Sequence, residues 1–206
     1  MKNRISNLIA KQFKRPSGIF GKYVSKKMQE GNNVVYKWMI SLMEFGKAKN
    51  VLEIGYGTGK VLLELAVLHD NITFYGIDFS KVMYDKALEN NNDIIKSGRM
   101  FLEFGEFLEY ESTVKFDVIY CINVIYFWDD LKTYLLKLNS LLNTNGVVYI
   151  YMTDKDFMIN FAKSSVFNKY SVDEVMQRID ESGFSCKSYA SGEIGKRKGY
   201  SIKAIK

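Results

Sequence analysis

Histidine and cysteine are scarce in this sequence. The chain of 206 residues has one histidine, His69, and two cysteines, Cys121 and Cys186. One histidine and two cysteines are too few to form a set of zinc ligands, so we expect no metal site. Two cysteines far apart in sequence also do not form a disulfide framework, and each is expected to be a small buried residue. His69 falls at the far end of an expected helix, so catalysis by histidine is not expected.

Proline and long apolar runs are also scarce. The one proline, a hydrophobic fraction of 47% and the lack of any low-complexity tract predict a folded chain. The strongest apolar run, residues 61–68, contains Glu64 and is too short to cross a membrane. Residues 1–15 lack the apolar core of a signal peptide. We therefore expect a cytoplasmic protein with one domain and an N-terminal addition.

A short apolar run that ends in alternating glycines organises the rest of the chain. Residues 51–59 read VLEIGYGTG, and leucines at helical spacing follow at once. This pattern predicts a strand, a tight turn and a helix start. Glycine suits such a turn because it adopts positive φ and because a Cβ would keep a ligand away from the backbone amides. A turn that only reverses the chain is the alternative.

Two acidic residues indicate which ligand the turn binds. Glu53 lies on the strand itself, where a buried carboxylate needs a donor or a cation, such as the ammonium group of a ligand. Asp78 ends the next apolar run, where a carboxylate can accept hydrogen bonds from both hydroxyls of a ribose. Lys60 stands where a dinucleotide-binding turn has its third glycine, which disfavours NAD.

The pattern Glu-x-Gly-x-Gly-x-Gly from Glu53 to Gly59, followed by Asp78, resembles the class I S-adenosylmethionine (SAM)-dependent methyltransferases of the small bacterial type. The resemblance runs from residue 50 to the end of the chain. It implies a Rossmann-like, doubly wound α/β fold, with a seven-stranded sheet that is mostly parallel, its last strand antiparallel, and an N-terminal helical lid. It also implies SAM as cofactor, S-adenosylhomocysteine (SAH) as product, and these cofactor-binding residues: Glu53, Gly55, Tyr56, Gly57, Thr58, Gly59, Asp78, Phe79, Glu106, Phe107 and Asn123. In this set Glu106 departs from the family, which usually has aspartate there.

The acceptor site is expected beside residues 122–130, which follow the fourth strand. In open parallel sheets the ligand crevice lies outside the carboxyl ends of the strands. Three consecutive aromatic residues there, Tyr126 to Trp128, suggest a pocket rim, with core packing as the alternative. The catalytic candidates are Tyr126, Trp128 and, from the N-terminal segment, Tyr23. Because a sulfonium methyl is already activated, transfer needs mainly an acceptor held in line at roughly 3 Å, and a catalytic base is optional.

Positive charge is concentrated at the N-terminus. Residues 1–30 hold eight Lys or Arg against Glu30 alone, a net charge of +7, which leaves −1 for the remaining residues. Such a segment fits nucleic acid, an anionic membrane surface, an acidic substrate or a solvated helical face. Apolar residues recur at helical spacing among these charges, so we predict a lid over the active site. The expected division is a helical cap, residues 1–48, and a SAM-binding methyltransferase domain, residues 49–206.

These observations predict a methyltransferase that acts on a small-molecule acceptor by in-line displacement, mainly through positioning. No motif of amino-group methylation and no paired cysteines of the tRNA-uracil or arsenite type are present. An RNA or DNA methyltransferase that uses the basic segment, and a SAM-binding protein without transferase activity, remain alternatives. The sequence leaves open the acceptor, the methylated atom and the oligomeric state.

Overall fold

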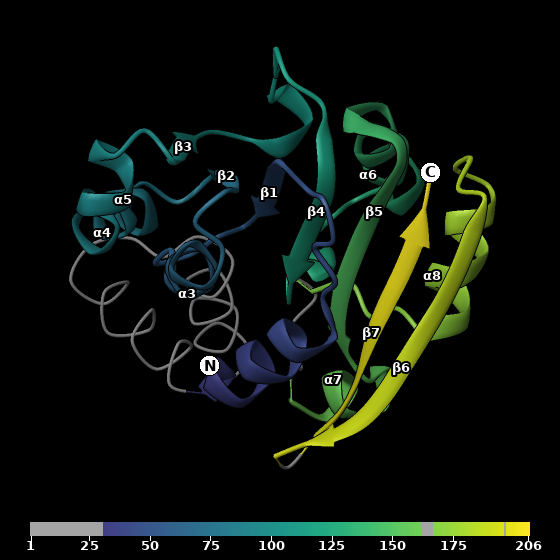
Figure 1. Cartoon of the computed structure of the whole chain (residues 1–206). Helices are drawn as coiled ribbons and strands as arrows, with labels where there is room; N and C mark the ends of the chain where they lie inside the picture. The colour runs from purple at the N-terminus through teal and green to yellow at the C-terminus, as the bar shows by residue number, and fades with distance from the viewer. Residues whose placement is uncertain (1–30, 162–166, 196) are drawn as a thin grey trace.

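A seven-stranded sheet forms the centre of the molecule (Figure 1). The structure is a computed structural model, and it describes residues 31–161, 167–195 and 197–206. The strands lie in the order β3-β2-β1-β4-β5-β7-β6, with parallel pairing from β3 to β5 and β7 antiparallel to both of its neighbours. The predicted sheet is therefore confirmed. The strands are β1 (Asn50–Ile54), β2 (Thr73–Asp78), β3 (Met100–Phe104), β4 (Phe116–Ile122), β5 (Leu142–Thr153), β6 (Cys186–Ile194) and β7 (Arg197–Ile205).

Helices cover both faces of this sheet. A helix that includes residues 31–42 precedes β1. The later helices are α3 (Lys60–Leu68), α4 (Lys81–Asn90), α5 (Asn92–Lys96), α6 (Leu131–Leu141), α7 (Lys155–Phe161) and α8 (Val172–Asp180), with short 3-10 helices η1 (Phe107–Glu109) and η2 (Ile125–Phe127). No helix among the described residues is long and apolar enough to cross a membrane.

Alternate residues of the central strands face two separate cores. On β1, Val51 packs into the core that contains α3, whereas Leu52 packs into the core that contains α6 and α8. On β4, Tyr120 faces the first of these cores and Ile119 the second. Because helices cover both faces, the central strands are nearly continuous runs of buried residues, as the apolar runs of the sequence predicted.

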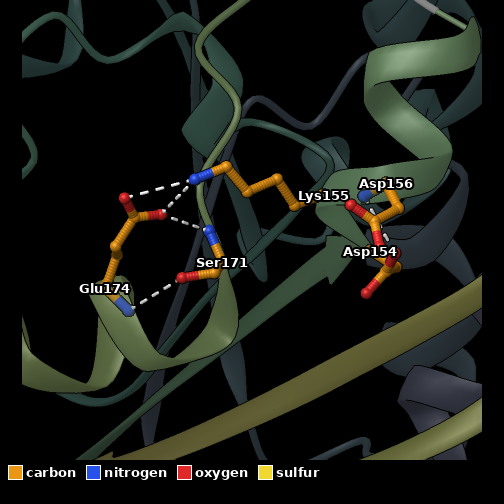
Figure 2. A network of polar contacts seen from close by, with 5 residues as sticks. All are labelled: Asp154, Lys155, Asp156, Ser171 and Glu174. Atoms are coloured by element: carbon orange, nitrogen blue, oxygen red, sulfur yellow. Dashed lines mark hydrogen bonds and ion pairs between the residues drawn. The ribbon is translucent and has the colours of Figure 1, made fainter.

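The start of α7 is tied to the start of α8, as Figure 2 shows. Ser171 and Glu174 form a capping box at α8, in which each side chain accepts a hydrogen bond from the other residue's backbone. The Glu174 carboxylate also binds Lys155 Nζ at 3.0 Å. Asp154 caps α7 by accepting the N–H of Asp156 over 2.9 Å. The capping contacts hold the helix ends, while an ion pair this exposed adds little stability.

Burial differs between the two cysteines. Cys121 is buried in β4, as expected, but Cys186 is exposed. The expectation of burial is therefore wrong for Cys186, because it lies on β6, the edge strand, most of whose residues are exposed. The helix of residues 31–42 contributes Val35 and Met39 to the same core as α3. The division into a cap and a domain at residue 48 stays a prediction.

Candidate functional site

The glycine turn between β1 and α3 leaves one position open. Gly55, Gly57 and Gly59 have positive φ angles of 69°, 56° and 71°. A Cβ on Gly55 would lie 2.5 Å from Val124 Cγ2, and one on Gly59 would lie 2.3 Å from Asn91 Nδ2. At Gly57, no atom of the described residues beyond its chain neighbours lies within 4 Å of the same point. Packing thus requires the outer two glycines, and Gly57 faces space that a ligand can occupy.

Glu53 places a buried carboxylate at the end of β1. Its side chain is 3% exposed, and the Tyr120 hydroxyl donates a hydrogen bond to Oε2 over 2.9 Å. Burial raises the pKa of Glu53 to about 8; the Tyr120 hydrogen bond opposes this rise, and the charge of Asp78 adds to it. None of the ion pairs between described residues involves Glu53. The site therefore favours a ligand group that brings a positive charge.

Asp78 ends β2 beside the same turn. Its Oδ2 accepts the N–H of Gly57 and its Oδ1 accepts the N–H of Ser80, each over 2.8 Å. Burial raises the pKa of Asp78 to about 6, although both hydrogen bonds lower it. Each carboxylate oxygen has a second lone pair, so Asp78 can position the turn and still accept hydrogen bonds from ligand hydroxyls. Since β1 and β2 are parallel neighbours, both carboxylates lie at one edge of the sheet.

The remaining predicted cofactor residues differ in how their side chains lie. Tyr56 is buried and its hydroxyl donates to the backbone oxygen of Glu103 over 2.9 Å, so only its backbone faces the turn. Phe107 is also buried and stacks on Tyr134 of α6, with ring centroids 6.2 Å apart. Thr58 and Phe79 are half-buried, and Glu106 is exposed.

Asn123 follows β4 and is the centre of a hydrogen-bond network. Its φ of 60° is in the left-handed region, which asparagine tolerates better than most residues. Its Oδ1 accepts hydrogen bonds from the Tyr126 hydroxyl over 3.3 Å and from Thr153 Oγ1 over 3.4 Å. Its Nδ2 donates to Asn32 Oδ1 over 3.2 Å, and Arg197 Nη2 donates to the same oxygen over 2.8 Å. The network thus joins β4, β5, β7 and the helix of residues 31–42.

The expected aromatic rim is wrong for Trp128. This side chain is 2% exposed, and its ring stacks on Tyr134 with centroids 4.8 Å apart and an interplanar angle of 11°. Tyr126 is also buried, and its hydroxyl accepts the backbone N–H of Thr153. The alternative of core packing therefore describes Trp128, because α6 supplies a ring that covers it. The third candidate, Tyr23, lies outside the described residues.

Sequence reasoning missed Thr153 and Arg197. Thr153 ends β5, and Arg197 begins β7. A signal for Arg197 was present, because a final strand that runs antiparallel to β5 must begin where β5 ends. Within residues 31–161, 167–195 and 197–206, no group of three or more His, Cys, Asp or Glu side chains is placed to hold a metal ion.

Residues 52–148 match a family described as a methyltransferase domain. The matched range includes Glu53, the glycine turn, Asp78 and Asn123. An uncharacterised protein of Rickettsia prowazekii (strain Madrid E) is 35% identical over 105 residues, which is 48% of this chain and 18% of that protein. The chain thus corresponds to a small part of that relative.

Solved structures share the fold at low sequence identity. A presumed O-methyltransferase from Nostoc punctiforme has a TM-score of 0.73 and 18% identity, over 88% of this chain and 58% of that one. A phosphoethanolamine N-methyltransferase from Haemonchus contortus, solved with phosphomonomethylethanolamine and SAH, has a TM-score of 0.70 and 16% identity, over 85% of this chain and 52% of that one. This chain therefore spans little more than half the length of these two proteins.

Proposed function

We propose, because residues 52–148 match a methyltransferase domain and the sheet has the class I SAM-dependent order, that this protein transfers the methyl group of SAM to a small-molecule acceptor. SAM is the donor and SAH is the product. The observation that carries the proposal is the pair of buried carboxylates, Glu53 and Asp78, at the turn whose open position is Gly57. One ligand that has both an ammonium group and a ribose satisfies the two carboxylates together.

Most of the predicted cofactor residues are assigned a role in this proposal. Asp78 accepts hydrogen bonds from the ribose hydroxyls, and Glu53 faces the ammonium group of the methionine part. The backbone of the glycine turn approaches the ligand closely, because Gly57 has no Cβ. Asn123 lies at the carboxyl end of β4, where the transferring methyl is expected. The residues proposed beside the adenine are Phe79, Glu106 and Phe107.

Transfer itself depends on positioning. The sulfonium carbon is already electrophilic, so the protein has to hold the acceptor in line and keep water away. Tyr126 supports this through its hydroxyl, which bonds to both Asn123 and the backbone of Thr153. We propose that Tyr126 positions Asn123, because its buried hydroxyl is already engaged with protein groups.

The acceptor class and the partners of the protein are part of the proposal. The Haemonchus contortus enzyme was solved with a small phosphorylated amine, which supports a small acceptor for this fold. The net charge of +7 in residues 1–30 supports the RNA methyltransferase as the alternative. The proposal includes a lid role for residues 1–30 and a cytoplasmic location, and a SAM-binding protein without transferase activity is the second alternative.

We expect SAM and SAH, and not NAD, to stabilise the protein. At 100 times its dissociation constant, SAH should add about 2.7 kcal/mol and raise the melting temperature by about 5–10 °C. Thermal shift with each ligand measures this. Transfer of labelled methyl from SAM to a panel of small molecules, with total RNA as a second arm, then separates the acceptors. Stabilisation by NAD alone would overturn the assignment of SAM as cofactor. Labelling of RNA without labelling of any small molecule would establish the RNA methyltransferase.

Substitution of Gly57 with alanine should block the cofactor without unfolding the protein. The new Cβ meets none of the described residues, but it enters the space proposed for SAM. We expect at least a tenfold loss of SAH affinity and a backbone cost of about 1 kcal/mol from the positive φ. Gly46→Ala is the matched control, because Gly46 also has positive φ and open space but lies in the turn before β1. Equal calorimetric affinities for the two variants would contradict the role of Gly57.

A further inference from the structure

Arg197 lies at the edge of the sheet where the proposed site is. Because β7 is antiparallel to β5, with Thr153 paired to Gly199, the first residues of β7 lie beside the carboxyl end of β5. In Figure 1 the start of β7 is accordingly near α7, at the end of the sheet toward which β4 and β5 run. Arg197 is half-buried there.

Hydrogen bonds place the Arg197 guanidinium one residue away from Asn123. Its Nη2 donates to Asn32 Oδ1 over 2.8 Å and to the backbone oxygen of Gly31 over 3.0 Å. Asn123 Nδ2 donates to the same Asn32 oxygen over 3.2 Å. Both of these Arg197 bonds use one nitrogen, and no described residue accepts a hydrogen bond from Nη1 or Nε, which leaves this part of the guanidinium fork for a ligand.

The charge of Arg197 acts on three tyrosines, and it has no ion-pair partner among the described residues. No carboxylate of the described residues forms an ion pair with it. Burial raises the pKa of Tyr36 to about 12 and also raises the pKa values of Tyr126 and Tyr151, and the nearby charge of Arg197 opposes each rise. A half-buried arginine near buried tyrosines, with no ion pair to a described carboxylate, is a place where an anion is stabilised.

The Tyr151 hydroxyl is a second, independent sign of a ligand. Tyr151 is 0% exposed. A weak hydrogen bond with the Thr153 side chain lowers its pKa, but no contact of this hydroxyl with the described residues has good hydrogen-bond geometry. This hydroxyl lies over Gly199, where a Cβ would be only 2.5 Å away, and Gly199 shares one face of β7 with Arg197, since alternate residues of a strand do so. A buried hydroxyl without a well-formed hydrogen bond is rare in native structures and calls for an explanation.

The neighbouring basic residue, Lys198, has different surroundings from Arg197. It points to the opposite face of β7, with Nζ 5.3 Å from the centroid of the Tyr200 ring. Tyr200, Asp154 and Glu193 all raise the pKa of Lys198, so this cation has acidic neighbours. Two adjacent basic residues thus have opposite surroundings, and Arg197 is the one whose charge is not offset by a described carboxylate.

We propose that Arg197 and the Tyr151 hydroxyl bind an anionic group of the methyl acceptor, either a carboxylate or a phosphate monoester. Arginine presents paired N–H donors that match both groups, and a tyrosine hydroxyl adds a third donor. The proposal rests on the proposed function, since it names the acceptor class of the same site. Through Asn32 and Asn123, the bound anion lies close to the expected position of the methyl group.

The test uses the full chain saturated with SAH and matched pairs of small molecules. Each pair is an acid and its amide, such as benzoate and benzamide, or a phosphate monoester and its alcohol, such as phenyl phosphate and phenol. In at least one pair, calorimetry should show that the anion binds more tightly than its neutral partner. Comparison of the two kinds of pair shows whether the site prefers a carboxylate or a phosphate. In a transfer assay with the same molecules and their hydroxylated or aminated analogues, the accepted molecules should be anionic.

Three variants separate binding from folding. Arg197→Gln should weaken the anionic probe about 10- to 100-fold, Tyr151→Phe about 3- to 10-fold, and Lys198→Gln should leave it unchanged. Tyr151→Phe should not lower the melting temperature, because it removes a hydroxyl that has no partner among the described residues. The proposal is overturned if no anion binds more tightly than its neutral match, or if Arg197→Gln and Lys198→Gln have equal effects. If the wild type does not bind SAH, the proposed function is overturned instead. The same anionic and neutral probes then test the Arg197 subsite in the protein without SAH.

Discussion

Replacing Glu53 with glutamine should weaken SAH binding about 10- to 100-fold, because it removes the carboxylate that faces the ligand's ammonium group. Glutamine keeps the size of the side chain and can still accept a hydrogen bond from Tyr120. The loss of affinity therefore reports the loss of the negative charge. Isothermal titration of SAH into the wild type and the variant measures it. Equal affinities would refute the role of Glu53.

The same substitution should change how the unliganded protein responds to pH. The pKa of Glu53 is about 8 in the folded chain, against an ordinary value of 4.5 for a solvated glutamate, so the folded chain holds this proton more tightly than the unfolded chain. The corresponding stability is fully present below the unfolded pKa and is lost as the pH rises to about 8. At pH 8 the loss is about 4 kcal/mol, since one pKa unit corresponds to about 1.4 kcal/mol.

Urea unfolding across this pH range distinguishes the variant from the wild type. Glu53→Gln should be more stable than the wild type at pH 8. Its free energy of unfolding should fall much less than that of the wild type between pH 5 and pH 8. Asp78, whose pKa is about 6, should cause a smaller fall in the free energy of unfolding, at lower pH and in both proteins. Binding of SAH near neutral pH should also release protons, because the ammonium group favours the ionised form of Glu53, and titration in buffers of different ionisation enthalpy detects them. Identical pH profiles would show that Glu53 is not protonated in the unliganded protein.

Substitution of Asp78 with alanine should weaken SAH binding by about 2–3 kcal/mol, which is about 30- to 150-fold. Alanine removes the acceptors for both ribose hydroxyls, and it also frees the N–H groups of Gly57 and Ser80 that Asp78 now holds. The turn thus loses both a ligand contact and an anchor. Asp78→Asn, which keeps one acceptor oxygen, should lie between the alanine variant and the wild type.

Asp117 offers a matched control for Asp78. Its Oδ2 accepts the backbone N–H groups of Lys49 and Asn50, and its Oδ1 accepts a hydrogen bond from Asn143. It therefore performs a similar anchoring role, but at the start of β4, the opposite edge of the sheet from the site. Asp117→Ala should destabilise the fold and leave the calorimetric affinity for SAH unchanged. A loss of affinity in Asp117→Ala as large as in Asp78→Ala would mean that the effect comes from general destabilisation.

The sequence predicted the fold class and the position of the glycine turn with its two acids. The mostly parallel, seven-stranded sheet with an antiparallel last strand was implied by the family resemblance of residues 53–59 and Asp78. The caps of α4 and α8 were read directly from Ser80 and Ser171, which act within a few positions of themselves. The glycine turn and the two acids beside it were also expected from the sequence, whereas the structure showed which of the three glycines faces open space. The turn and the helix caps are local features, so neighbouring residues are enough to indicate them.

Other features were decided only by tertiary structure. Trp128 is a core residue and not part of a rim, because α6 places Tyr134 against its ring. The raised pKa of Glu53 arises from burial between layers that residues distant in sequence provide. Asn123, Asn32 and Arg197 meet only because β7 returns antiparallel beside β5 and the helix of residues 31–42 packs over the same edge. The sequence by itself determined the glycine turn, its two acids and the class of the sheet; ionisation, burial and the surroundings of Arg197 depend on which distant residues the fold brings into contact, and sequence spacing does not specify those contacts.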